Sequence, residues 1–206
     1  MYSVKALDSE NIAPVSRIIE GIYWCIDNDI NIINMSFGTV NYSNALRIAV
    51  EDAYESGILM IAAVGNESST IEYPAAFSQV MGVAAVGTDA EIAEFSNMGD
   101  EVEIAAPGEK VKVNSFFGFQ TVTHGTSIAA PHVTGAASLL WQKDTSKSNE
   151  FIRQLLAHSS KNIENTDECG LLDVSYALEI YDEFSIDTGN VPENMADPET
   201  FEEIDE

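Results

Sequence analysis

One serine in this chain, Ser127, follows a turn of small residues and begins an apolar run that contains a proline near its start. This order predicts a helix that begins at or just before Ser127. The first N–H groups of a helix have no partner inside it, so the Ser127 N–H can receive an anion that forms beside the hydroxyl group. One interpretation is therefore a nucleophile with half of an oxyanion hole. The other is that Ser127 or Thr126 only caps a buried helix.

A second residue with chemical potential is Asn66, which comes directly after the apolar run at residues 58–64. Such a run is typical of a strand that is covered on both faces. Chemistry in an open α/β sheet gathers at the carboxyl ends of the strands, where an asparagine amide can donate a second hydrogen bond to an oxyanion. The alternative for Gly65-Asn66 is an ordinary turn.

The elements that must position these two residues alternate along the chain. Apolar residues recur at helical spacing in some segments, and short apolar runs bounded by turn residues separate them. This alternation predicts an α/β fold with a doubly wound, mostly parallel sheet. Strands are expected at residues 2–7, 30–35, 58–64, 80–86, 102–105 and 110–115, and helices after Val15, Ser43, Ser127 and Ser148 and at 174–181.

The composition of the 206 residues, 45% of them hydrophobic, predicts one domain at residues 1–181. All Lys and Arg residues lie before residue 162, and the acidic segment 182–206 is expected to be a disordered or loosely attached tail. A net charge of −25 argues against a nucleic-acid partner. No run is long enough to span a membrane, the first residues lack a signal-peptide pattern, and both cysteines are expected to be free thiols.

The stretch around Ser127 reads Gly-Thr-Ser-x-Ala-x-Pro-His-Val-x-Gly-Ala-Ala. It resembles the nucleophile segment of the subtilisin-like serine peptidases, the subtilases, and the resemblance extends over residues 1 to about 178. It implies a serine endopeptidase that acts on peptides or proteins, with Ser127 as the nucleophile and Asn66 as an oxyanion donor. It also implies a secreted or extracellular protein.

Other segments of the chain are similar to the substrate-binding parts of that family. Ile-Asn-Met-Ser-Phe-Gly, which ends at Gly38, resembles the segment that lines the primary specificity pocket and pairs with substrate as an added strand. Glu-Tyr-Pro-Ala, which begins at Glu72, resembles the loop that closes the floor of that pocket. The substrate-binding residues implied by the resemblance are Ser36, Phe37, Gly38, Ala63, Gly65 and Glu72.

The family's catalytic aspartate and histidine precede the segment that matches residues 2–7, and no equivalent motif occurs in this chain. His124 belongs to the serine motif, while core or surface roles are expected for His132 and His158. The resemblance therefore implies that the sheet is incomplete on its N-terminal side. We expect the chain alone to be inactive and unstable or self-associating. The alternative function is a non-catalytic relative that binds peptides.

Glu72 stands where many relatives have glycine, and Glu67 follows the candidate oxyanion asparagine. Two carboxylates that face one pocket would favour a cationic side chain before the cleaved bond. In the alternative, Glu72 points into solvent. No cofactor is expected, and no metal site is assigned because the family's tight calcium site draws mainly on the upstream segment.

Overall fold

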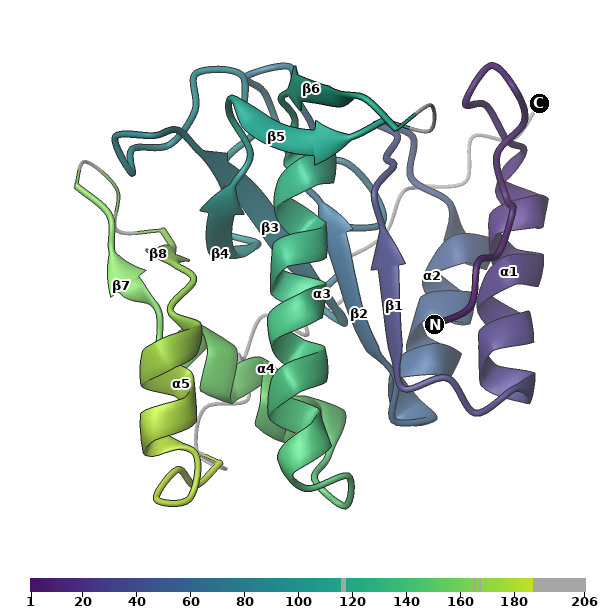
Figure 1. Cartoon of the computed structure of the whole chain (residues 1–206). Helices are drawn as coiled ribbons and strands as arrows, with labels where there is room; N and C mark the ends of the chain where they lie inside the picture. The colour runs from purple at the N-terminus through teal and green to yellow at the C-terminus, as the bar shows by residue number, and fades with distance from the viewer. Residues whose placement is uncertain (116–117, 165, 167, 187–206) are drawn as a thin grey trace.

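A computed structural model of the chain describes residues 1–115, 118–164, 166 and 168–186. Its main sheet has the strand order β1-β2-β3-β4-β8-β7 (Figure 1). All neighbouring strands are parallel except the pair at the β7 edge. The strands are β1 Ile32–Met35, β2 Leu59–Ala63, β3 Val80–Val86, β4 Val102–Pro107, β7 Lys161–Asn162 and β8 Gly170–Leu171. A separate antiparallel hairpin consists of β5 Val111–Asn114 and β6 Gln120–Thr123.

Five helices occur in the described part of the chain: α1 Val15–Asp27, α2 Asn44–Glu55, α3 Thr126–Lys143, α4 Asn149–His158 and α5 Val174–Ile180. Two of them begin as the sequence predicts. The Ser43 hydroxyl accepts a hydrogen bond from the Leu46 N–H, and the Ser148 hydroxyl accepts one from the Phe151 N–H. These side chains satisfy backbone donors that the first helical turn leaves without a partner. None of the helices in this part of the chain is long and apolar enough to cross a lipid bilayer.

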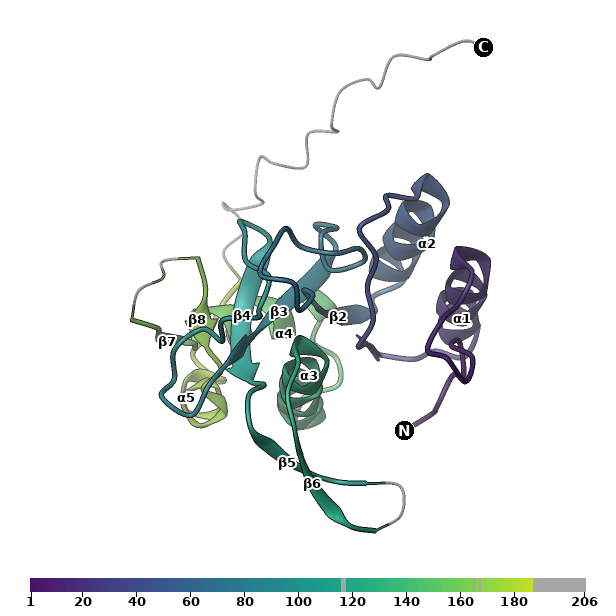
Figure 2. The same cartoon turned by 90° about the horizontal axis from the view of Figure 1, so that it is seen from above.

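The helices cover both faces of the sheet (Figure 2). Along β2, Leu59 and Ile61 pack in one hydrophobic cluster with α3, α4 and α5, while Met60 and Ala62 pack in a second cluster with α1 and α2. Side chains of one strand alternate between the two faces, so a strand buried on both sides reads as a continuous apolar run. The predicted doubly wound α/β fold is confirmed.

The strand predicted at residues 2–7 is absent from the structure, and this prediction was wrong. The segment has no regular secondary structure and lies against α1 instead of joining the sheet. The rings of Tyr2 and Trp24 meet edge to face at 6.0 Å, and Val4 lies next to Gly21. A strand is stable only beside a hydrogen-bonded neighbour, and residues 2–7 pair with no strand of the main sheet.

Two residues beyond position 181, Phe184 and Ile186, contact the first hydrophobic cluster. Phe184 packs against the first hydrophobic cluster, with ring centroids 5.5 Å from Phe151 and 5.4 Å from His158. The rest of the predicted tail, residues 187–206, lies outside the described residues.

Candidate active site

Ser127 lies at the beginning of α3, where the sequence predicts it, and is half-buried. The preceding Gly125 has φ 140°, a conformation that residues with a side chain rarely adopt. Its N–H donates to the carbonyl of Gly108 at 2.8 Å, which attaches the turn to the segment that follows β4. The Ser127 N–H has no hydrogen bond within the described part of the chain, so this helix end retains a free donor.

Asn66 follows β2 and meets the same turn. Its side-chain oxygen accepts hydrogen bonds from the Thr126 N–H at 2.8 Å and from the Thr126 hydroxyl at 3.0 Å. The two donors orient the amide, because an amide oxygen held in this way leaves the NH2 group on the other side. That NH2 group has no hydrogen-bond partner among the described residues.

The two free donors lie around one point. A Cβ atom placed on Gly125 would be 3.8 Å from Nδ2 of Asn66 and from the backbone N of Ser127, and 3.7 Å from Oδ1 of Asn66. Gly125 has no Cβ, so this position is open. Two N–H donors that lie close to one open position beside a serine form an arrangement that can stabilise an oxyanion.

A chain of polar contacts joins this turn to β1. The Ser36 hydroxyl donates to the Ser127 carbonyl at 3.0 Å, and the Asn34 amide donates to the Ser36 hydroxyl at 2.9 Å. The Thr134 hydroxyl of α3 donates to the amide oxygen of Asn34, also at 2.9 Å. The carboxyl end of β1 is therefore tied to the first three turns of α3. Of the candidate substrate-binding residues, Ser36 makes a direct contact with the backbone of Ser127.

The other candidate substrate-binding residues lie at the ends of β1 and β2. Ala63 is the buried last residue of β2, and Gly65 is buried two residues further on. Gly38 is exposed, whereas Phe37 is half-buried and packs against the cluster of α1 and α2. Glu72 lies close to both glycines. The structure therefore gathers the predicted residues at one end of the sheet.

Two residues that position this site were missed by the sequence analysis. Thr126 orients Asn66, although the sequence suggested only a capping role for it. Asn97 is 1% exposed and accepts hydrogen bonds from the N–H groups of Glu67 and Ser69 at 2.9 and 3.0 Å. Its amide donates to the carbonyls of Val64 and Thr70. A fully satisfied buried asparagine of this kind holds a loop in one shape, and the available signal was its place in the segment Phe95-Ser96-Asn97.

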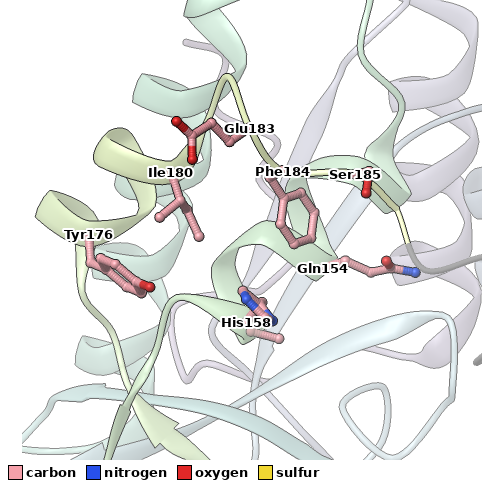
Figure 3. Close-up of a pocket in the computed structure, with 8 residues that line it drawn as sticks. Gln154, His158, Tyr176, Ile180, Glu183, Phe184 and Ser185 are labelled. Atoms are coloured by element: carbon pink, nitrogen blue, oxygen red, sulfur yellow. The ribbon is translucent and has the colours of Figure 1, made fainter.

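None of the three histidines, all of which lie in the described part of the chain, hydrogen-bonds to the Ser127 hydroxyl. His124 lies 5.7 Å from the ring of Phe95, and Nδ1 of His132 is 2.9 Å from the carbonyl oxygen of Ile128. His158 lines a pocket of about 560 Å³ between α4 and α5, together with Tyr176 (Figure 3). These helices lie away from the beginning of α3 in Figure 1. No group of three possible metal-ligating side chains occurs among the described residues.

Fold and site together define an α/β protein with a serine and two converging N–H donors at the carboxyl ends of parallel strands. A model of the subtilase family of peptidases matches residues 1–175. The chain therefore belongs to the subtilase family.

Named relatives support this assignment. The chain is 41% identical over 170 residues to Subtilisin DY of Bacillus licheniformis, an alignment that covers 79% of this chain and 61% of the relative. It is 39% identical over 156 residues to the minor extracellular protease Epr of Bacillus subtilis, covering 75% of this chain and 24% of Epr. The chain thus spans less than two thirds of the length of these relatives. The self-cleaved protease domain of PatA matches with a TM-score of 0.78 and 28% identity, covering 87% of this chain and 72% of that domain.

Proposed function

We propose that this chain carries the nucleophile and the oxyanion hole of a serine endopeptidase. The observation that supports the proposal is the convergence of the Asn66 amide and the Ser127 N–H on one open position beside Gly125. The Ser127 hydroxyl oxygen would attack the scissile carbonyl carbon, and the two donors would stabilise the negative charge that develops on the carbonyl oxygen. The leaving amine would depart, and water would then hydrolyse the acyl-enzyme.

This mechanism needs a base to take the proton of Ser127 and return it to the leaving amine. We propose that a histidine outside this chain does so, oriented by an aspartate, as the resemblance to subtilases implies. The substrates would be peptides or proteins. By analogy with the relatives, including one that is named as extracellular, a secreted or extracellular location is proposed.

A second candidate function is peptide binding without catalysis. The observation that favours it is that none of the three histidines, all within the described residues, contacts the Ser127 hydroxyl. The free donor of Asn66 favours the peptidase, because binding alone does not require an oriented amide beside a serine. The DNA upstream of the codon for Met1 discriminates between the two: a reading frame that encodes the missing motifs favours the peptidase.

The direct test is hydrolysis of a peptide library by this chain expressed together with that upstream segment. Ser127→Ala should abolish turnover. Asn66→Ala should cost about 3–4 kcal/mol of transition-state stabilisation, the value known for the equivalent donor of subtilisin itself. Thr134→Ser, which keeps the hydroxyl group that contacts Asn34, is the matched control and should leave turnover near that of the parent. Unchanged turnover in Ser127→Ala would refute the proposal.

A further inference from the structure

The backbone of Glu72 is attached to the ends of two strands. Its N–H donates to the carbonyl of Val64, just beyond β2, at 3.0 Å. The next residue, Tyr73, exchanges two hydrogen bonds of 2.8 and 2.9 Å with Thr39, beyond β1. These contacts hold the Glu72 segment across the two strand exits that carry the candidate substrate-binding residues. The direction of the Glu72 side chain is thus set by backbone hydrogen bonds on both sides.

The carboxylate of Glu72 lies between two glycines. A Cβ atom placed on Gly38 would collide with Oε2 of Glu72, and one placed on Gly65 would be 3.1 Å from Cδ. Only residues without a side chain leave room for the carboxylate here. The group is half-buried and turned toward the strand exits, which differs from the solvent-directed alternative.

No cation neutralises this carboxylate within the described part of the chain. None of the ion pairs there includes Glu72, and none of its hydrogen bonds comes from a Lys or Arg. Burial, followed by the like charge of Glu67, raises the pKa of Glu72 above its usual range. A half-buried carboxylate without a counter-ion is unfavourable, and a ligand that brings a positive charge removes that penalty.

We infer that Glu72 selects peptides that place a cationic side chain, Lys or Arg, between the strand exits at Gly38 and Gly65. The inference rests on the proposed function, in which these exits bind the peptide. A large apolar side chain would be disfavoured because it would remove water from the carboxylate without replacing the hydrogen bonds of that water. The net charge of −25 would attract basic peptides to the same region.

The test is a binding experiment that requires no hydrolysis. Two fluorescent peptides differ at one position, where one carries Arg and the other carries citrulline, which has nearly the same shape without the charge. Binding is measured by fluorescence anisotropy on the chain with Ser127→Ala. We expect the Arg peptide to bind about tenfold more tightly, and Glu72→Gln to reduce this ratio to about one. Glu55→Gln removes one charge at the last residue of α2 and should keep the tenfold ratio.

Equal binding of the two peptides, or a tenfold ratio that Glu72→Gln leaves unchanged, would overturn the inference. The two tests can fail separately, because binding is measured on the Ser127→Ala chain and hydrolysis on the chain expressed with its upstream segment. A charge preference in binding, with no hydrolysis by the chain that carries the upstream segment, would refute the peptidase and leave the role of Glu72 intact. Hydrolysis of peptides without a preference for Arg over citrulline would support the peptidase and overturn the role of Glu72.

Discussion

The two edges of the main sheet are built differently. The β7 edge consists of two exposed residues, Lys161 and Asn162, and Lys161 pairs with Asp173 at 2.7 Å. The β1 edge is twice as long and carries Ile32, Ile33 and a buried Met35. Short strands and lysines are common ways to protect an edge from pairing with another strand. Only the β7 edge has these features.

This difference has a consequence for function, because the unprotected edge is also the one beside the candidate site. Ser36, one residue beyond β1, contacts the Ser127 backbone. A strand added to β1 would therefore end close to Ser127, since parallel strands direct their carboxyl ends to the same side of the sheet. We expect the β1 edge to receive a further strand and the β7 edge to remain free.

The largest expected effect concerns catalysis at the β1 side. Without a base, the reactivity of Ser127 toward a fluorophosphonate probe should be on the order of 10⁶-fold below that of a complete site, which is the loss known for subtilisin itself when its histidine is removed. Addition of an upstream segment that contains the histidine should restore labelling, as measured by mass spectrometry of the Ser127 peptide. Rapid labelling of the chain alone, lost in Ser127→Ala, would mean that a base is present elsewhere.

A second prediction compares core positions on the two sides. Ile104 of β4 is 0% exposed, and Ile104→Ala should lower the free energy of unfolding by about 2–5 kcal/mol. Ile33→Ala on β1 should cost less than half as much, because Ile33 is only partly buried. Urea unfolding followed by circular dichroism measures both. Equal losses of unfolding free energy in the two variants would mean that another strand or another molecule covers the β1 edge in solution.

The third prediction tests which edge associates. We expect the chain to self-associate at micromolar concentrations through β1, and Asn31→Lys to weaken this association about tenfold by placing a charge at the exposed start of that edge. Asn162→Lys on β7 is the matched control and should have no effect. Sedimentation velocity measures the change. A chain that stays monomeric and unfolds in one sharp, reversible transition would refute the prediction.

The smallest expected effect lies near the β7 side, where residues 182–186 follow α5. Phe184→Ala removes the contacts with Phe151 and His158 and should cost about 1 kcal/mol of local stability. Limited proteolysis should then cut within 182–186 about fivefold faster than in the parent chain. Val122→Ala on the exposed hairpin strand β6 is the control, with an unchanged cleavage rate. An equal rate in Phe184→Ala would mean that this segment is held by other contacts.

Local patterns in the sequence predicted the positions of most helices and strands. The apolar run at residues 80–86 became β3 with the same limits, and Ser43 and Ser148 cap helices as expected. The position of Ser127 at a helix start also followed from the sequence, since a glycine turn and an early proline act on the backbone locally. The exceptions were the segment at residues 2–7, which is not a strand, and the short strands β6, β7 and β8, which were not predicted. Whether such short segments form strands depends on the neighbouring strand available to them, and no pattern within a few residues encodes that.

The sequence by itself determined which residues stand at strand ends and helix starts, because hydrophobic periodicity and turn chemistry act over a few neighbouring positions. Only the tertiary structure decided how these residues face one another. Thr126 turns the amide of Asn66 across 60 residues of chain, Asn97 holds the loop after β2, and backbone bonds from Val64 and Thr39 direct Glu72 between two glycines. These contacts join segments that are distant in sequence, and their geometry exists only after the sheet and α3 have packed together.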